Sequence, residues 1–383
     1  MNLNFTVNEQ YRKKFYYVVR GEIIMQKITK LMIAVIALVV LSITVFPQTL
    51  NVLGKSPEKP KSYYLDEIKD TAQKVKALTK EPALVFFLCS DVHYNTVKTD
   101  NRLKLDSVTD MTTNMAALKK QIQVDGLICL GDIVDAKPPT KMDETKQQID
   151  YVMKRLQGVG VPLIYSMGNH DDNRYISRKD GTVLTPQQIE SMFMRYTLPN
   201  KVIDPSMNGL NYYVDYDRLK IRVFVVDSNY PNPADGFHWS HGFSDNTVAW
   251  FSNCLNEVPK GWSILVLTHR RLVQNKNPGK KWIYNQMKMV ETVNNFIANG
   301  GTYIATISGH IHRDYSHSKP FLEFSVAAQK CQNIEAKKGK AIAPERKLNT
   351  ASEDLWDVLV IRPQSRKINT VRFGAGDDRE WSY

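Results

Sequence analysis

Short apolar runs alternate with stretches of helical periodicity along most of the chain. The runs cover residues 83–89, 126–130, 161–165, 221–226, 263–267 and 302–307. Each run has the length of a strand, and an uninterrupted apolar run is expected of a strand that is covered on both faces. The pattern therefore predicts buried strands at these positions.

Apolar residues at helical spacing separate several of these runs. Residues 108–122 carry an apolar side chain every three or four positions, and Asp106 precedes them as a candidate N-cap. Residues 149–156 and 189–193 show the same spacing. Strands separated by helices are typical of an α/β fold.

The pattern changes after residue 320, where the helical spacing fades. Residues 321–326, 355–361 and 369–373 are expected to be consecutive strands of a second sheet. No Pro- or Gly-rich break interrupts the chain from residue 83 onward. Residues 83–383 are therefore interpreted as one domain.

The N-terminal region has a different character. Residues 31–46 form a 16-residue stretch without a charge, with Lys27 and Lys30 before it and Pro47 after it. A basic, then apolar, then polar order is typical of an export signal or an N-terminal membrane anchor. Residues 1–30 contain six Lys or Arg and two Glu, so the positive-inside rule places the rest of the chain outside the cytoplasm. We expect an extracytoplasmic protein, either secreted or anchored to the outer face of a membrane.

The boundaries of this region leave alternatives open. Residues 25–50 are predicted to be a signal peptide or a retained anchor, because no A-x-A cleavage site decides between them. Met25 opens a compact signal-like segment, so residues 1–24 are either a mis-assigned extension or a cytoplasmic tail. Residues 51–82 are interpreted as a linker and an entry helix.

Residue types that bind metals follow five of the predicted strands. They are Asp91 and His93, Asp132 and Asp135, Asn169 and His170, His269, and His310 and His312. In an open α/β sheet the carboxyl ends of the strands form the crevice in which ligands bind. The five clusters are therefore expected to converge on one cavity.

The chemistry of these side chains favours a metal site. Asp, His and Asn without Cys suit divalent Mn, Fe, Zn or Co. The ligands are numerous enough for two ions, and an Asp carboxylate has two oxygens with which it can bridge them. Two ions about 3.5 to 4 Å apart can bind both the attacking and the leaving oxygen of an in-line displacement.

The motifs D-x-H, G-D-x-x-D, G-N-H-D, H and G-H-x-H resemble those of the calcineurin-like metallophosphoesterase superfamily. They occur here at residues 91–93, 131–135, 168–171, 269 and 309–312. The resemblance covers roughly residues 83–373 and implies a four-layer α/β/β/α sandwich with a dinuclear site at the C-terminal edge of the strands. It also implies the ligands: Asp91, His93 and His312 bind the first ion, Asn169, His269 and His310 bind the second, and Asp132 bridges them.

By the same resemblance, His170 is the general acid and Asp135 orients it. The chemistry is consistent with these roles, since an imidazole titrates near neutral pH and can protonate a departing alkoxide. A water shared by two divalent ions loses a proton near neutral pH and can attack phosphorus. Asp135 could fix the tautomer of His170 and favour its protonated form, or it could only cap a loop. Arg174 and Arg270 are candidates to bind a phosphate oxygen, and the alternative for both is surface charge.

Two positions and one C-terminal segment allow a comparison of the chain with subfamilies of this superfamily. Ala136 stands where protein Ser/Thr phosphatases of this superfamily carry Arg, and Asp135 where purple acid phosphatases carry Tyr. Both branches are therefore disfavoured. Residues 373–379, with the sequence FGAGDDR, resemble a C-terminal motif of bacterial members, or are a glycine turn that ends the last strand.

Composition narrows the functional classes. Hydrophobic residues make up 43% and charged residues 23% of the chain, which excludes a disordered chain and a multi-span membrane protein. The 4 Cys lack C-x-x-C spacing, which excludes a zinc ribbon and a thioredoxin site. The net charge of +12 favours anionic partners. Residues 1–30 supply +4 of this charge, and the remaining +8 is too diffuse to favour nucleic acid.

The sequence therefore predicts an exported or membrane-anchored, metal-dependent hydrolase of phosphate esters. The alternative enzyme is a phosphodiesterase or nuclease that acts on an anionic polymer. A non-catalytic metal-binding module that recognises phosphorylated envelope material is the alternative outside enzymes. Such a module needs no general acid, and His170 argues against it.

Overall fold

The computed structural model describes residues 59–97, 102–136, 141–173, 183–207, 209–230, 241–273 and 283–383. The predicted extension at residues 1–24, the signal or anchor at 25–50 and the start of the linker lie outside the described residues. In the described ranges, no helix combines the length and the apolar character needed to cross a membrane.

The first of two large sheets has six strands in the order β15-β14-β13-β1-β2-β3. Its strands are β1 (Leu84–Cys89), β2 (Gly126–Cys129), β3 (Leu163–Tyr165), β13 (Leu355–Arg362), β14 (Lys367–Gly374) and β15 (Arg379–Ser382). Strands β1, β2 and β3 are parallel, and β13 pairs with β1 antiparallel. The carboxyl ends of β1, β2 and β3 therefore lie at one edge of this sheet.

The second large sheet has seven strands in the order β4-β5-β6-β7-β8-β10-β9. Its strands are β4 (Val202–Ile203), β5 (Tyr212–Tyr216), β6 (Ile221–Val225), β7 (Ser263–Leu267), β8 (Thr302–Ser308), β9 (Tyr315–His317) and β10 (Glu323–Ser325). Strands β6, β7, β8 and β10 are parallel to one another. A separate short hairpin consists of β11 (Lys337–Lys338) and β12 (Ala341–Ile342).

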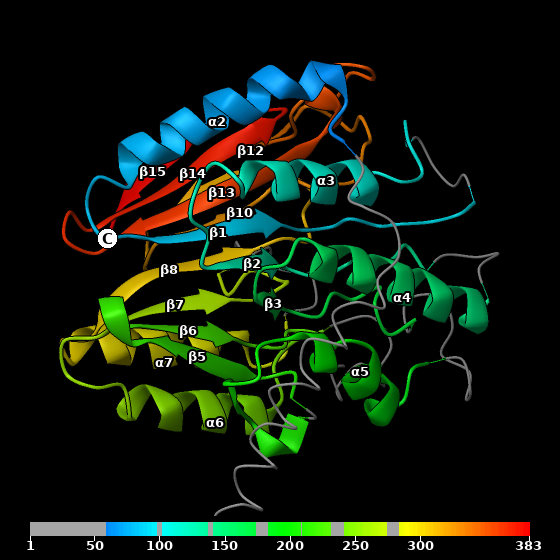
Figure 1. The fold of residues 1–383 in the computed structure, drawn as a ribbon. Coiled ribbons are helices and arrows are strands. Elements are labelled where there is room, and N and C mark those ends of the chain that lie inside the picture. The colour runs from blue at the N-terminus through cyan, green and yellow to red at the C-terminus, as the bar shows by residue number, and fades with distance from the viewer. Residues whose placement is uncertain are drawn as a thin grey trace, which may run out of the picture. The chain divides into compact units, whose positions relative to one another are not determined.

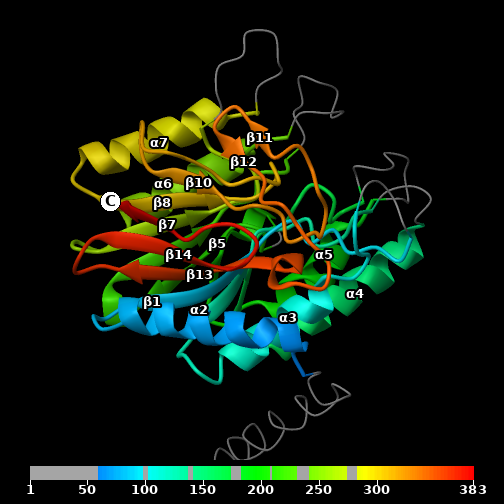
Figure 2. The same ribbon diagram turned by 90° about the horizontal axis from the view of Figure 1, so that it is seen from above.

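Helices cover the outer side of each sheet (Figures 1 and 2). The helices are α2 (Leu65–Leu78), α3 (Val108–Leu118), α4 (Met142–Gly158), α5 (Pro186–Met192), α6 (Asp245–Asn256) and α7 (Gln286–Ala298). Helices α2 and α3 lie along the first sheet, and α6 and α7 along the second. This arrangement is the predicted α/β fold with four α/β/β/α layers, and the prediction of the fold class is confirmed.

Short 3-10 turns complete the secondary structure, at Ser62–Tyr64, Met194–Tyr196, Pro205–Met207, Asp217–Leu219 and Ala351–Glu353.

Helix α2 falls in the segment interpreted as linker and entry helix. Its buried residues Ile68, Ala72 and Val75 belong to the same core as β1 and β14, so the helix is a layer of the sandwich.

The strands predicted from apolar runs are present as β1, β2, β3, β6, β7 and β8. The three predicted helices are present as α3, α4 and α5, and the Asp106 carboxylate accepts a hydrogen bond from the backbone N–H of Thr109 at 3.0 Å. Helices α6 and α7 were not predicted from the sequence. In each of them few apolar residues are buried, so the apolar stripe is short.

The prediction that the last three strands form a sheet of their own is wrong. Residues 323–325 form β10, which extends the second sheet beside β8, whereas β13 and β14 extend the first sheet beside β1. The apolar pattern of β13 reports its burial correctly, since residues 355–361 are all buried. Burial alone does not specify the neighbouring strand, and the open edge of β1 accepts β13 across about 270 residues of chain.

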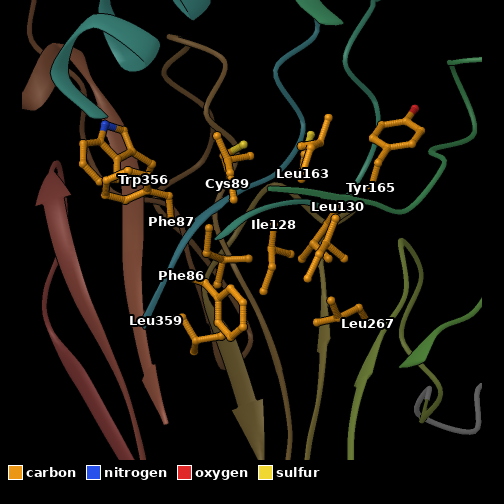
Figure 3. Packing of buried hydrophobic residues seen from close by; sticks show 14 of the residues in the cluster. Phe86, Phe87, Cys89, Ile128, Leu130, Leu163, Tyr165, Leu267, Trp356 and Leu359 are labelled. Carbon is orange, nitrogen blue, oxygen red and sulfur yellow. The ribbon is translucent and has the colours of Figure 1, made fainter. Parts of the chain in front are cut away.

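The largest hydrophobic cluster contains residues of both sheets and of helices α2, α3 and α4, and a second cluster joins the second sheet to helices α6 and α7. Phe86, Phe87 and Leu359 from the first sheet and Leu267 from the second belong to the same cluster (Figure 3). The ring of Phe87 packs edge-on against Trp356 at 5.4 Å between centroids. This contact joins β1 to β13, so it stabilises the strand from which the first metal-binding motif emerges.

Replacing Phe87 tests this packing. Phe87→Ala should lower the free energy of unfolding by about 3 to 5 kcal/mol, because the ring is fully buried and its loss leaves a cavity beside Trp356. Val202→Ala is the control, since Val202 is 47% exposed and its loss should change stability by only about 0.5 kcal/mol. Urea denaturation followed by circular dichroism measures both values. A loss below about 1 kcal/mol for Phe87→Ala would contradict the packing described here.

Candidate metal centre

The motif residues gather at the carboxyl ends of strands from both sheets. Asp91 and His93 follow β1, Asp132 follows β2 and Asn169 follows β3, all in the first sheet. The second sheet contributes His269 after β7, and His310 and His312 after β8. The two sheets therefore supply complementary halves of one site.

Four side chains form the first candidate metal group, with one ligand atom of each within 4.8 Å of the others: Asp91, His93, Asp132 and His312. The Nε2 atoms of His93 and His312 lie 3.0 Å apart. His312 Nε2 is 3.2 Å from Asp91 Oδ1, and His93 Nε2 is 3.6 Å from Asp132 Oδ2. Ring nitrogens and carboxylate oxygens thus face a common point.

Asp132 also belongs to a second candidate group, with His269 and His310. Its Oδ2 atom lies 3.1 Å from His269 Nε2, which is also 3.1 Å from the side-chain oxygen of Asn169. Asp132 is the residue shared by this group and by the first group. Its carboxylate is therefore placed where a bridging ligand between two ions must be.

The tautomers of two histidines are set by their other ring nitrogen. His93 Nδ1 contacts Asp135 Oδ1 at 3.1 Å, and His269 Nδ1 donates to the backbone oxygen of Leu130 at 2.7 Å. With the proton on Nδ1, Nε2 of a neutral ring, which faces the shared carboxylate Asp132, is the nitrogen that can bind a metal. This arrangement is the usual one for an imidazole that binds a metal.

The carboxylates fit a cation. Asp91 and Asp132 are almost fully buried, and Asp91 Oδ1 accepts no hydrogen bond from the described residues. Burial by itself would raise the pKa of Asp91, but His312 and His93 hold it well below its usual range. Asp132 likewise has a pKa well below its usual range, because His269 and His170 outweigh the effect of burial. Two buried anions, one of them with an unused oxygen, match the hard donors that divalent ions require.

Left-handed backbone conformations concentrate in these loops. The positive φ angles are 53° at Asp91, 47° at His93, 51° at Asp132, 68° at His310 and 56° at His312. Non-glycine residues rarely adopt such angles, and each costs about 1 to 3 kcal/mol unless its surroundings compensate. Five of the seven proposed ligand positions carry this strain, which is typical of a functional site.

Asp171 holds the loop that carries Asp132, a role that the sequence did not suggest. Its carboxylate accepts hydrogen bonds from the backbone N–H of Asp132 at 2.9 Å, of Ile133 at 2.8 Å and of Gly168 at 2.7 Å. Burial and the nearby Asp132 raise the pKa of Asp171 to about 6. A Cβ at position 168 would lie 2.0 Å from the backbone nitrogen of Asp132, so the two loops approach closely enough to require glycine.

Asp135 contacts two histidines, one through its backbone oxygen and one through its carboxylate. Its backbone oxygen accepts a hydrogen bond from His170 Nδ1 at 2.6 Å, whereas its carboxylate contacts His93 Nδ1. Arg102 donates to the same carboxylate at 2.6 Å and to the backbone oxygen of His93 at 2.9 Å. Lys330 Nζ is 3.8 Å from Asp135 Oδ1. Arg102 and Lys330 lie in loops outside the motifs, and no pattern in the sequence marked them.

The pKa values of His170 and His269 are shifted in opposite directions. Burial lowers the pKa of His170 to about 4, although Asp132 opposes this shift. Burial also acts to lower the pKa of His269, but the adjacent Asp132 carboxylate raises it to about 9. The ring of His170 packs edge-on against His93 at 4.7 Å between centroids. His170 therefore lies beside the first candidate group.

Of the two arginines predicted to bind phosphate, only Arg270 is among the residues that the structure describes. Arg270 Nη1 is 2.8 Å from His310 Nε2, and its Nη2 is 3.4 Å from His241 Nδ1, so its guanidinium reaches the second group. Arg174 lies outside the described residues. Arg271, next to Arg270, stacks over the ring of Tyr315 at 4.6 Å.

Comparisons with known proteins agree with this geometry. The fold is similar to a dimetal phosphatase from Danio rerio, with a TM-score of 0.58, 14% identity, and coverage of 79% of this chain and 100% of that chain. It is also similar to a purple acid phosphatase from yellow lupin (Lupinus luteus) seeds, with a TM-score of 0.51, 11% identity, and coverage of 79% of this chain and 54% of that chain. No curated protein sequence matches the chain.

The family model of the calcineurin-like phosphoesterases matches residues 84–314, which is more than half of the chain. This range includes each of the proposed ligand positions from both sheets. The chain therefore belongs to the calcineurin-like phosphoesterases, which are metal-dependent phosphoester hydrolases that use two divalent metal ions.

Proposed function

We propose that this chain is an extracytoplasmic hydrolase of phosphate esters whose two metal ions share Asp132. The observation that supports it most is the position of the Asp132 carboxylate, which lies 3.6 Å from His93 and 3.1 Å from His269. In this proposal, Asp91, His93 and His312 hold the first ion, and Asn169, His269 and His310 hold the second. When bound, the two ions would lower the pKa of a shared water and polarise the phosphate for in-line attack.

His170 is proposed to donate a proton to the leaving oxygen. The residue is 7% exposed, and its Nδ1 donates to the backbone oxygen of Asp135, so Nε2 is the nitrogen that can exchange a proton with a substrate. With a pKa near 4, the ring on its own is mostly neutral at pH 7. A phosphate dianion beside the ring would raise this pKa, because a nearby negative charge favours the imidazolium.

Arg270 is proposed to bind a non-bridging phosphate oxygen. Its Nε has no hydrogen-bond partner among the described residues. Burial lowers the pKa of Arg270 to about 10, although Asp132 and Asp91 oppose this shift, so the group is still cationic at neutral pH. A guanidinium forms strong charge-assisted hydrogen bonds to phosphate. Arg174, which follows the G-N-H-D motif, is proposed as a second such residue on sequence grounds alone.

The alternative reaction is the cleavage of phosphodiesters, including those of an anionic polymer. The net charge of +12 permits such a substrate. A non-catalytic metal-binding module is disfavoured. The ring of His170 lies 4.7 Å from that of His93, and a proton donor at this position is needed for catalytic turnover but not for binding.

The proposed location rests on the sequence of the N-terminal region. Residues 31–46 are uncharged and follow a basic segment, which favours export through a signal or retention through an anchor. Among phosphate esters, an extracytoplasmic enzyme would meet those of the envelope or the surroundings of the cell.

Asp132→Asn tests the metal centre and the reaction together. The variant should lose most bound metal and nearly all activity, because an amide offers one neutral oxygen where a bridge needs two anionic ones. Metal content and hydrolysis of p-nitrophenyl phosphate, its bis ester, nucleotides and phospholipids are measured on metal-reconstituted protein. Asp215→Asn is the control, because Asp215 pairs with Arg222 on β5 and β6. Two ions per chain and normal turnover in Asp132→Asn would rule out the bridging role.

His170→Asn tests the proton donor. The variant should keep both ions but hydrolyse an alkyl ester roughly 10²- to 10⁴-fold more slowly, because an alkoxide leaving group needs a proton. Hydrolysis of the p-nitrophenyl ester should fall much less, since nitrophenolate is stable as an anion. The ratio of kcat/KM for the two esters, with metal content measured on the same sample, checks this expectation. Equal losses with intact metal would instead indicate that His170 binds the phosphate.

A reporter fusion tests the location. A periplasmic or extracellular reporter joined after Leu50 should be active when translation begins at Met25, because residues 25–50 hold the basic and apolar parts of the signal. Replacing Val39 and Val40 with Arg interrupts the apolar stretch and should retain the reporter in the cytoplasm. A reporter that stays cytoplasmic with the natural sequence would exclude export.

A further inference from the structure

Four charged side chains, two of them buried and two partly buried, meet between the G-H-x-H loop and the last strands of the chain. They form the Asp314 cluster, which consists of Asp314, Asp357 on β13, Arg372 on β14 and Arg379 on β15. Arg372 Nη2 is 2.9 and 3.0 Å from the two carboxylate oxygens of Asp314, and Arg372 Nε is 2.9 Å from Asp357 Oδ1. Arg379 Nη1 is also 2.9 Å from Asp314 Oδ1. The cluster thus joins the two sheets through paired charges.

Stability alone does not account for this cluster. The side chains of Arg372 and Asp357 are each 1% exposed, and that of Asp314 is 13% exposed. Removing charges from water is so costly that a buried ion pair often stabilises a fold no more than apolar residues would. What such a network does provide is a fixed geometry, since each guanidinium binds its carboxylates in one orientation.

The segments that the cluster fixes lead to the ligands of the first ion. Asp314 is two residues beyond His312, and its Oδ1 accepts a hydrogen bond from the backbone N–H of Ala327 at 3.1 Å. Three residues later, the backbone N–H of Lys330 donates to the backbone oxygen of Asp91 at 3.0 Å. One carboxylate therefore holds both the loop of His312 and the segment that supports Asp91.

The turn after β14 is built around Arg372. Arg372 Nη1 donates to the backbone oxygen of Ala375 at 2.9 Å, and the Asp378 carboxylate accepts from the backbone N–H of Arg372 at 2.8 Å. A Cβ at position 376 would lie 2.6 Å from Arg372 Nη1, and φ there is +107°, so this position requires glycine. Residues 373–379, which the sequence left open, thus form a turn that encloses the guanidinium.

We propose that the Asp314 cluster sets the affinity of the first metal ion by positioning His312 and Asp91. Asp314, Arg372 and Arg379 are positioning residues in this proposal, and the C-terminal hairpin of β14 and β15 becomes part of the machinery of the site. The proposal rests on the proposed ligand set. It predicts a larger effect on the first ion than on the second. The described contacts of the cluster do not include His269 or Asn169, two of the ligands proposed for the second ion, whereas His310, the third, shares the loop of His312.

The experiment titrates metal-free full-length protein with Mn²⁺ and resolves two binding phases by calorimetry. His312→Ala identifies the phase that belongs to the first ion. Asp314→Asn should weaken that phase by roughly 10- to 100-fold, the usual effect of losing a group that orients a ligand, and should weaken the other phase much less. Asp215→Asn removes a carboxylate that pairs with Arg222 at 2.8 Å and should leave both phases unchanged. The absorption spectrum of the Co²⁺-loaded protein should change with Asp314→Asn and not with the control.

Arg379→Met serves as the second variant if Asp314→Asn does not fold. It leaves Arg372 paired with Asp314 and should weaken the first phase selectively, though less than Asp314→Asn. Unchanged affinity in a folded variant, or an equal loss in both phases, would overturn the proposal. A wild-type protein that binds fewer than two ions would instead contradict the proposed metal centre, which separates the two failures.

Discussion

The carboxylate of Asp132 is the constraint on which the site depends. It lies at the junction of the two sheets, facing His93 from the first and His269 from the second. A buried carboxylate is costly unless cations or hydrogen bonds surround it, so the loops around it must bring such groups close. The consequences extend to the backbone: Asp132 itself has a φ of 51°, and Gly168 must lack a side chain to leave room for it. The two sheets must therefore be aligned with each other at this edge for the site to form.

Carboxylates that are not proposed ligands hold the ligand loops after β2, β7 and β8 in place. Asp171 accepts from the N–H groups of the loop after β2, and Asp314 fixes the loop after β8. Glu323 on β10 accepts from the N–H groups of Leu272 at 2.6 Å and Val273 at 3.0 Å, just beyond His269 and Arg270. A hydrogen bond between a charged carboxylate and an amide is stronger than one between neutral groups, and it has a defined direction. Such bonds can offset the strain of left-handed residues, which keeps the ligands oriented before an ion binds.

The sequence predicted the parts of the molecule that depend on local patterns. Buried parallel strands have continuous apolar runs, and the motif residues at their ends had to meet because parallel strands share one carboxyl edge. Sheet membership was predicted wrongly for β13 and β14, since pairing with β1 joins segments far apart in the chain and leaves no local pattern. The same reason hid Arg102 and Lys330, which reach Asp135 from loops without periodicity. Local patterns thus identify the proposed ligands, while tertiary contacts determine which residues orient them.

The two functions of Asp135 suggest how metal binding and proton transfer are kept separate. Its carboxylate lies beside Arg102 and Lys330, and although burial opposes it, contact with His93 holds the pKa of Asp135 well below its usual range. The carboxylate is therefore ionised at any physiological pH and can keep the proton of His93 on Nδ1, which leaves Nε2 for the first ion. His170 instead donates to the backbone oxygen of the same residue, a neutral acceptor that stabilises the imidazolium less than a carboxylate would. In the proposed mechanism, protonation of His170 would then depend on the charge of a bound phosphate, so the acid would form when a substrate is present. One residue thereby holds the proposed ligand His93 through its side chain and the proposed proton donor His170 through its backbone.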